Sequence, residues 1–534
     1  MWRRVACCLG LVLVAGCGGG GPYAQTEPGV VRAFWTDPPK PIEPANTNEV
    51  QGGKVLDMAF RGLKRYDPET GKAVNAVAES VDTEDQRTFK VKLKKGWRFS
   101  DGSPVTAKSF VDAWNYGALV TNKQVASYFF EYIEGYADVH PESGKPKAKT
   151  MSGLKVTGPR SFTVRLKQKF SLWPQTLGYS AYAPLPEVFF TDHAHWMKKP
   201  VGNGPYKVDS YAKGQAMKLS RNPYYAGEDK PKNKGVELRV YTDQNTAYTD
   251  LQADNLDIID ELPAAQLKNA SKDLEGRYIN QPAGILQTLS FPMYRKDWKQ
   301  ALQVRRGLSM AINRDEVSKV IYSGTRKPAG DYTSPVLRER GGYAPHMCGE
   351  ICEYHPDKAR KLIKRGGGLP GGKVTVSSNV DTGSHQLWME AVCNSINATL
   401  RRSDACSVNP VPTFGEFRGD VQGNRMTSMF RAGWQMDYPL IQNFLQPLFS
   451  SGGSSNDSGY GDKRVDALMN KANSAPEKQA ISTFQQAERQ VLRDFPAIPL
   501  WYQNGNAGYS ERVHDVRLNP FSVPVFTDIR VGED

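Results

Sequence analysis

A short segment near residue 430 carries the residue types that could bind a small ligand. Arg431, Gly433, Trp434 and Asp437 stand within Phe-Arg-Ala-Gly-Trp-Gln-Met-Asp-Tyr-Pro, residues 430–439, an otherwise largely apolar stretch. An ionised group in apolar surroundings is costly unless a partner of opposite charge meets it. The segment therefore predicts that a ligand pairs with the arginine or the acid. The alternative is an ion pair or a helix cap inside the protein.

Motifs of the common enzyme classes are missing from the sequence. It contains no HExxH, no GxSxG, no P-loop and no GxGxxG after a strand. Ser152 and Lys155 match the SxxK pattern of penicillin-recognising acyl enzymes, but that motif must start a helix for the lysine to reach the hydroxyl, and here a strand pattern follows. His193 and His195 are more typical of a solvated loop than of a metal pair. We expect no catalysis and no cofactor.

The first residues have the pattern of an export signal. Arg3 and Arg4 precede an apolar stretch of twelve residues, 5–16, which is too short to span a bilayer. It ends in Val-Ala-Gly-Cys, which resembles the bacterial lipobox, whose cysteine receives a diacylglyceryl thioether. Because several acyl chains anchor a protein stably, we expect a lipoprotein signal at 1–16, Cys17 as the lipidated residue and a flexible tether at 17–28. An ordinary signal with a stray cysteine is the alternative.

The remaining cysteines point to disulfides. Of seven cysteines, Cys348, Cys352, Cys393 and Cys406 lie in the body of the mature chain. An even number in an oxidising compartment suggests two disulfides, and we favour the local pairings, Cys348 with Cys352 and Cys393 with Cys406. The alternative is zinc, because His346 and His355 flank the first pair. The spacing of those four residues matches no common structural zinc site.

Length and charge bound the class of protein. The chain has 534 residues, enough for two to four domains at about 150 residues each. Lys and Arg number 69 and Asp and Glu 56, a net charge of +13, but the charges of both signs are interspersed. This argues against nucleic acid as a partner. A basic body is more typical of proteins beside anionic envelope polymers or a membrane.

Strand and helix patterns alternate along the chain, which predicts an α/β fold. Apolar and polar residues alternate over 88–99 and 161–167, the period of strands with one wet face. Thr106, Asn313 and Asp462 can each begin a helix, and Pro476 opens a long one. Further strand-like runs lie at 373–377, 429–434 and 498–502.

Ordered blocks over nearly the whole mature chain resemble the bacterial extracellular solute-binding proteins of family 5, the oligopeptide- and dipeptide-binding receptors of ABC importers. The blocks are GLKRYDP at 62–68, KLKKGWRFSDG at 92–102, GNGPY at 202–206, RNPYY at 221–225, AINR at 311–314 and GWQMDYP at 433–439. Two features depart from the family pattern: Leu440 stands where the family often has Asp, and residues 348–352 look like an insertion.

The resemblance implies a two-lobed, periplasmic-binding-protein-like fold of class II (cluster C) with an extra inserted domain. Domain I would comprise 29–60, 191–281 and 503–534, domain II 61–190 and domain III 282–502. Ligand would lie between domains I and III, which close about a hinge.

The resemblance also implies roles for single residues. Asp437 would pair with the α-ammonium of a peptide and Arg431 with its carboxylate, while the strand at Gly433 offers backbone groups and Trp434 walls the pocket. Further resemblance places Val50 and Tyr128 near the ligand. If residues 431–437 form one extended strand, the two charged side chains stand about 20 Å apart on one face, which favours peptides of three to five residues over dipeptides.

The function implied is that of a monomeric, lipid-anchored receptor on the extracellular face of the cell membrane. It would capture oligopeptides and deliver them to an ABC permease. One alternative is the same fold with an oligosaccharide, a nickel complex or haem as solute. The other is a wall-associated acyl enzyme built on Ser152.

Overall fold

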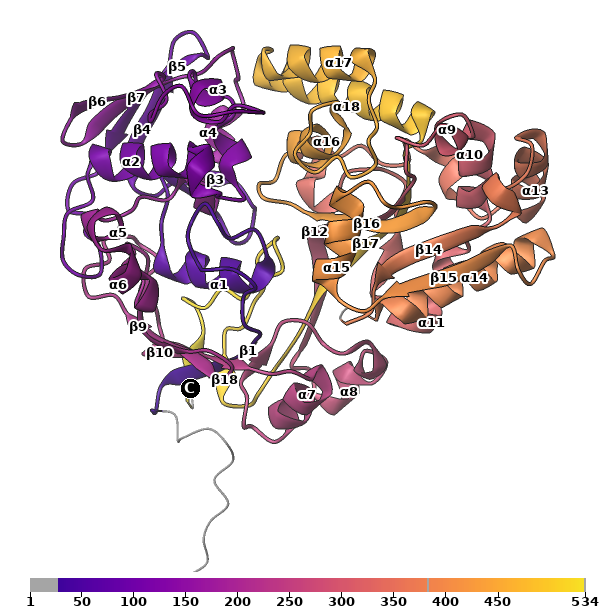
Figure 1. Cartoon of the computed structure of the whole chain (residues 1–534). Helices are drawn as coiled ribbons and strands as arrows, with labels where there is room; N and C mark the ends of the chain where they lie inside the picture. The colour runs from indigo at the N-terminus through magenta and orange to yellow at the C-terminus, as the bar shows by residue number, and fades with distance from the viewer. Residues whose placement is uncertain (1–26, 382–383, 533–534) are drawn as a thin grey trace, which may run out of the picture.

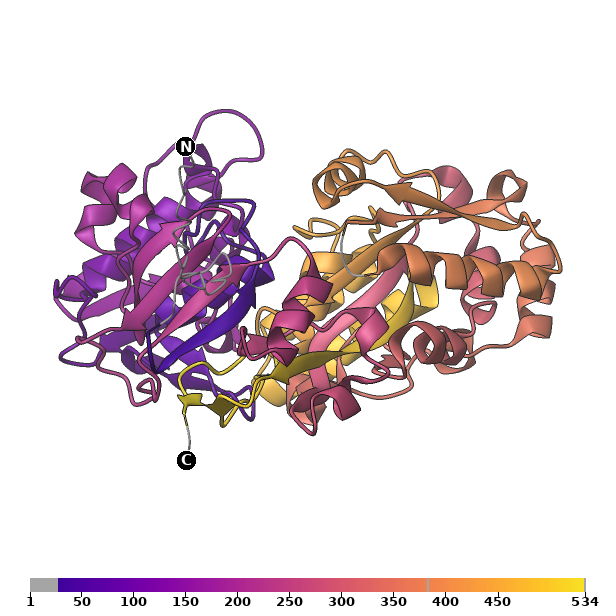
Figure 2. The same ribbon diagram turned by 90° about the horizontal axis from the view of Figure 1, so that it is seen from below.

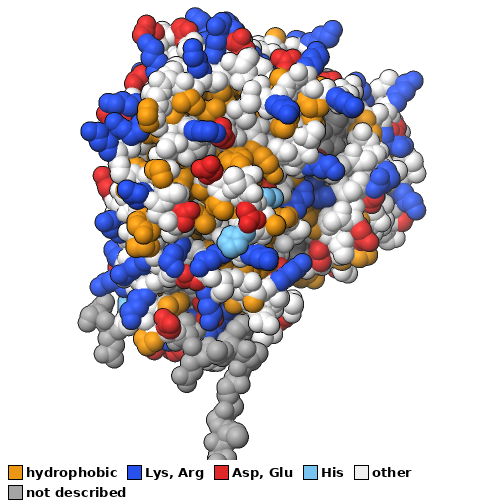
Figure 3. All heavy atoms as spheres, turned by 60° about the vertical axis from the view of Figure 1, so that its left-hand side comes forward, with side chains coloured by type: hydrophobic (Ala, Val, Ile, Leu, Met, Phe, Trp, Pro, Cys, Tyr) orange, Lys and Arg blue, Asp and Glu red, His pale blue; other side chains and the backbone are white. Residues whose placement is uncertain are grey.

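The computed structural model describes residues 27–381 and 384–532, which form two lobes side by side (Figure 1). The predicted lipidation site, Cys17, and the signal and tether lie almost wholly outside these residues. No described helix is both long and apolar enough to cross a membrane. Charges of both signs are interspersed over the face of the first lobe (Figure 3), as the sequence indicated.

The first lobe is built on strands from both ends of the chain's first half. Strand β1 (Val30–Trp35) pairs in parallel with β10 (Gly235–Val240). β10 pairs antiparallel with β9 (Ala216–Arg221), and β9 pairs antiparallel with β8 (Tyr206–Ala212). Helix α1 (Val50–Ala59) contacts β8. This helix carries the first lobe's contribution to the cleft described below.

A separate antiparallel sheet of four strands lies at the top of the first lobe. Its order is β4 (Ala78–Thr83), β5 (Thr88–Leu93), β7 (Ser161–Arg165) and β6 (Leu154–Gly158). Helix α2 (Ala107–Ala118) covers it with the fully buried Phe110 and Trp114, both of which contact Phe162. The alternating residues in β5 and β7 therefore have their apolar face against this helix, as predicted.

The second lobe holds a sheet in which β14 (Val374–Asn379) is parallel to both β15 (Cys406–Val411) and β16 (Met429–Gln435). Four helices pack against one another at the right of this lobe in Figure 1: α10 (Leu302–Met310), α11 (Arg314–Tyr322), α13 (Pro356–Arg365) and α14 (His385–Leu400). At the upper end lie α16 (Ile441–Phe449), α17 (Lys463–Asn473) and α18 (Glu477–Asp494).

Two long strands join the lobes. β12 (Tyr278–Ser290) and β17 (Ala497–Tyr509) pair antiparallel over most of their length, and β17 continues to β11 (Ile258–Ile259) beside β1. Figure 2 shows β17 passing from one lobe toward the other. The pairing of β12 with β17 shifts register between Pro282 and Ile285 and again between Gln287 and Thr288. The predicted boundaries of domains I, II and III stay a prediction.

The predicted helix starts are confirmed. Thr106 accepts a hydrogen bond from the Ser109 amide at the start of α2, and Asn313 does the same for Glu316 at the start of α11. Asp462 accepts from the amides at the start of α17. These side chains satisfy amides that the helix itself leaves without partners.

Two minor sequence expectations have clear outcomes. Ser152 and Lys155 are exposed and lie in a turn and in strand β6, not in a helix, so the SxxK geometry is not formed. The expectation of a loop at His193 and His195 is wrong: both lie in the short helix α6 (His193–Lys198), which begins because Asp192 accepts from the His195 amide.

The cysteines form the two local disulfides, Cys348 with Cys352 and Cys393 with Cys406. Since the two sulfurs of the first pair are joined to each other, they are not available as the thiolate ligands of the zinc alternative. The second disulfide ties the buried face of α14 to the start of β15.

Candidate functional site

A cavity of about 450 Å³ lies between the two lobes. The second lobe contributes Gln435, Met436 and Asp437, where β16 ends, and the first lobe contributes α1 from Val50 onward. A smaller cavity of about 120 Å³ shares Val50 and Gln435 with the larger one. The two spaces therefore adjoin at these residues, and the smaller one extends from the end of β16 across its neighbours β12 and β17, which contribute Ile285 and Gln503.

Asp437 is a half-buried carboxylate without a counter-charge. No Lys, Arg or His nitrogen of the described chain lies within 4 Å of it. Its carboxylate accepts a hydrogen bond from Asn443 Nδ2 over 2.9 Å, and the side chain of Tyr179 also hydrogen-bonds to it. Burial disfavours the charged form and raises the pKa of Asp437 to about 7, although hydrogen bonding by Asn443 and Tyr179 acts in the opposite direction. A ligand cation would remove this penalty.

Asn443, in the first turn of α16, holds the site together. Its Oδ1 accepts from the Asp437 backbone N–H over 2.8 Å and from Trp434 Nε1 over 3.0 Å, and its Nδ2 fixes the Asp437 carboxylate. A side-chain amide supplies both functions at once, an oxygen that accepts and a nitrogen that donates. This residue was not predicted from the sequence, because nothing there distinguishes it from the amides Gln442 and Gln446 of the same helix.

Neither of the two alternatives for this segment, an ion pair inside the protein or a helix cap, describes the structure. Asp437 and Arg431 do not form an ion pair with each other or with any other described residue, and Leu440, the residue before α16, makes no side-chain cap. Arg431 is half-buried, with a single long hydrogen bond of 3.3 Å from Nε to Gln287 Oε1. Burial and the charge of Arg326 lower the pKa of Arg431 to about 10.

The edge of β16 is open where Gly433 lies. β12 pairs with β16 from Phe430 to Gln435, but on the other side β14 pairs only with Met429 and Phe430. Within the described chain, no strand pairs with that edge from Arg431 onward, and Gly433 is exposed. Unpaired backbone groups at a strand edge are able to bind an extended peptide.

One geometric expectation is wrong. The strand does not continue from Arg431 to Asp437, because β16 ends at Gln435. Gly433 does not interrupt it, since the pairing with β12 runs evenly through this position. The extended span of about 20 Å between the two charged side chains therefore overstates their separation along the strand direction.

Val50 and Tyr128 lie on different sides of the site. Val50 begins α1, is 39% exposed and lines both cavities. Tyr128 lies in the 3₁₀ turn Ser127–Phe130, close enough for the charge of Asp437 to contribute to raising its pKa. It lines a third cavity, of about 360 Å³, together with Tyr438 and Asn443.

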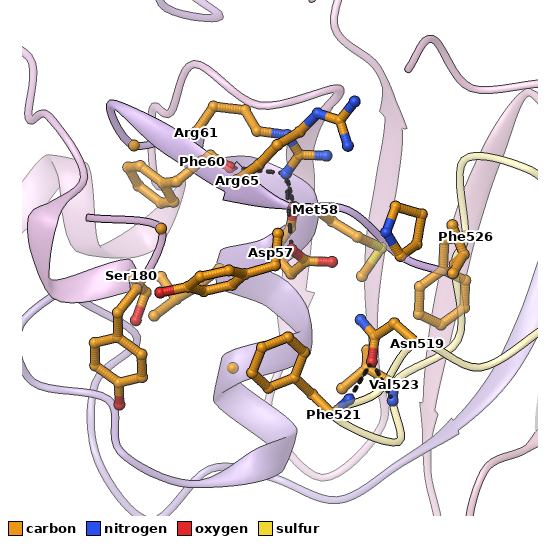
Figure 4. Close-up of a pocket in the computed structure, with 18 of the residues that line it drawn as sticks. Asp57, Met58, Phe60, Arg61, Arg65, Ser180, Asn519, Phe521, Val523 and Phe526 are labelled. Atoms are coloured by element: carbon orange, nitrogen blue, oxygen red, sulfur yellow. Dashed lines mark hydrogen bonds and ion pairs between the residues drawn. The ribbon is translucent and has the colours of Figure 1, made fainter. Parts of the chain in front are cut away.

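One part of the main cavity, lined by the end of α1 and the C-terminal segment, was not predicted from the sequence. Figure 4 shows Asp57 on α1, Arg61 and Arg65 just after that helix and, across the cavity, Phe521 and Phe526 of the C-terminal segment. Arg61 is paired with Asp229 over 2.8 Å. These residues come together from segments more than 400 positions apart, and no sequence pattern links them.

Comparisons with known proteins agree with this architecture. The family of bacterial extracellular solute-binding proteins, family 5, matches through its middle region at residues 72–456. The oligopeptide-binding protein OppA of Bacillus subtilis is 21% identical, covering 87% of this chain and 86% of its own. The dipeptide-binding protein DppE of the same organism is 25% identical, covering 87% and 84%.

A solved structure supports the fold. The Haemophilus influenzae OppA complex with the peptide RPPGFSPFR superimposes with a TM-score of 0.81 at 19% identity and covers 95% of this chain and 100% of that one. The two-lobed α/β fold expected from the sequence blocks is thereby confirmed.

Proposed function

The chain belongs to the bacterial extracellular solute-binding proteins of family 5, and we propose that its solute is an oligopeptide, captured between the lobes and delivered to an ABC permease. The observation that carries this proposal is the uncompensated carboxylate of Asp437 at the end of the open edge of β16. A peptide supplies both an ammonium for the acid and a backbone for the edge. The oligopeptide- and dipeptide-binding relatives support the same solute class.

Capture requires the lobes to move, and contacts at the rim support a closed state. Ser171 Oγ donates to the Ala475 carbonyl over 2.6 Å, and Gln175 Nε2 donates to Glu477 Oε1 over 3.1 Å. Both pairs join the second lobe to the part of the first lobe that contains the four-stranded antiparallel sheet. We propose that the interrupted ladder at Pro282 is the hinge about which these contacts open.

We further propose that the receptor is a monomer held at the membrane by a lipid on Cys17. The body begins with β1 at Val30, and a tether of about a dozen residues has a coil reach of roughly 20 Å. The body would stay close to the membrane surface, where the permease lies. The enzyme alternative loses its motif, because Ser152 does not start a helix.

Titration calorimetry with tetra-alanine and N-acetyl-tetra-alanine tests the peptide assignment. Free tetra-alanine should bind, and acetylation should weaken binding by about 100-fold or more, because it removes the charge that Asp437 needs. Equal binding of both peptides would eliminate the ammonium role of Asp437, and binding of neither would move the assignment to a non-peptide solute. Mass spectrometry of molecules that co-purify with the protein would then identify it.

A further inference from the structure

Two arginines of the second lobe form no ion pair with any described residue, and the charge of one acts on the other. Arg326 comes from β13 (Arg326–Pro328) and Arg431 from β16. Arg326 is only 8% exposed, and its guanidinium carbon lies 3.6 Å from the centre of the Tyr322 ring. Its Nη1 is buried and has no hydrogen-bond partner among the described residues.

The protein supplies little negative charge to this pair. Glu261 is the acid whose charge acts on both arginines, but it is exposed, and no ion pair within 4 Å joins it to either of them. Its neighbour Asp260 is already paired with Lys54 over 2.6 Å. Burial lowers the pKa of Arg326, and the two arginine charges repel each other. Buried charges of one sign are costly in this state unless an anion joins them.

The pair lies beside the path of the proposed peptide. Arg326 and Tyr322 line the smaller cavity, which adjoins the main cavity at Val50 and Gln435. Glu261 and the lysine-paired Asp260 line it too, so Glu261 is the acid there that has no ion pair within the described residues. Arg431 begins the open edge of β16, and Asp437 follows the strand's other end. A peptide with its ammonium at Asp437 would therefore have its carboxyl-terminal end near the two arginines.

We propose that Arg326 and Arg431 form a site for two negative charges, so that the preferred peptides carry an acidic side chain at or next to their C-terminal residue. One carboxylate, that of the chain end, would meet Arg431, and the acidic side chain would meet Arg326. A guanidinium suits either group, because its planar donors match a carboxylate. This inference rests on the proposed function and adds a preference among peptides.

The alternative role for Arg326 is purely structural, as a cation stacked on Tyr322. A stacked arginine would stabilise the fold without distinguishing one peptide from another. Peptide selectivity therefore separates the two roles, and it can be measured on the unaltered protein.

Calorimetric titration with two matched pairs of peptides tests the proposal. The pairs are Ala-Ala-Ala-Glu with Ala-Ala-Ala-Gln, and Ala-Ala-Glu-Ala with Ala-Ala-Gln-Ala. The wild type should bind the Glu peptide of at least one pair about tenfold more tightly. Arg326→Gln should reduce this preference to about twofold or less, whereas Arg326→Lys should keep part of it.

The matched control is Arg425→Gln, which removes an exposed arginine of the same lobe that is paired with Asp420. This variant should keep the full preference, since only long-range charge has changed. Equal affinity of wild type for Glu and Gln peptides would overturn the proposal, as would a preference that survives in Arg326→Gln. If no peptide binds the wild type, the peptide function itself is wrong and the preference with it.

Discussion

Protonation of Asp437 should compete with peptide binding. Its pKa of about 7 in the unliganded site means that the carboxylate is only partly ionised near neutral pH. A bound ammonium stabilises the ionised form, so binding below pH 7 must displace a proton. The affinity of the wild type should therefore fall as the pH is lowered.

The size of the effect follows from the ionised fraction. With a pKa of about 7, roughly three quarters of the carboxylates are charged at pH 7.5 and about 1% at pH 5, so the apparent affinity should fall by about 50- to 100-fold between these values. The upper limit of pH 7.5 matters because a peptide's own α-amine loses its charge near pH 8. Its C-terminal carboxylate stays ionised throughout the range.

Asp437→Asn separates this residue from the other groups that titrate. The variant keeps the shape of the side chain but leaves the ammonium without a counter-charge, which should cost about 3–4 kcal/mol, or about 10²- to 10³-fold in affinity at pH 7.5. What affinity remains should vary little with pH. Asp420→Asn, which removes an exposed acid of the same lobe, should bind like the wild type.

Calorimetric titration of tetra-alanine at pH 5, 6, 7 and 7.5 into the three proteins gives the result. Two outcomes would refute the reasoning. One is a wild-type affinity that does not change with pH, and the other is an Asp437→Asn variant that binds as tightly as the wild type. Either would mean that no cation of the ligand meets this carboxylate.

Three further predictions concern the anchor, the disulfides and a buried acid. Cys17→Ala should fold normally but leave the membrane fraction; equal membrane association would contradict the lipid anchor. Thiol titration of the denatured, unreduced protein should find none of Cys348, Cys352, Cys393 and Cys406 free, and loss of the Cys393–Cys406 bond should cost a few kcal/mol at most, measured by denaturant unfolding. Glu488 is fully buried, and burial raises its pKa to about 8. Because the unfolded chain ionises this carboxyl near pH 4.5 and the folded protein only near pH 8, the free energy of unfolding should be highest below pH 4.5 and fall as the pH rises toward 8. Glu488→Gln should therefore raise the melting temperature at pH 8 much more than at pH 5, and an equal shift at both would contradict the buried-acid explanation.

Local patterns in the sequence were sufficient for the elements with one wet face and for the capped helices. Phe89 and Val91 alternate with lysines because only one side of β5 is buried, and Thr106 begins α2 through a contact three residues away. Such features depend on neighbours along the chain, so the sequence displays them directly.

Features that depend on distant segments could not be predicted in this way. Asn443 matters only because α16 starts just where β16 ends, which brings its amide onto Asp437 and Trp434. Arg326 and Arg431 are more than 100 residues apart in the chain, and nothing near Arg326 in the sequence indicates an unpaired charge. The family resemblance pointed to Arg431 and Asp437, but the partners that orient them came from the fold.

The pairing of β12 with β17 bears on how far different parts of the lobes would move when the cleft opens. The two strands stay bonded to each other on both sides of the hinge proposed at Pro282, so a rotation there would bend them together. Under such a rotation, displacement grows with distance from the axis. Figure 1 places α4 (Trp173–Thr176) and α17 at the end of the cleft remote from the crossing strands. The rim contacts of Ser171 and Gln175 therefore travel farthest, and they would govern how fast the cleft opens although they touch no ligand.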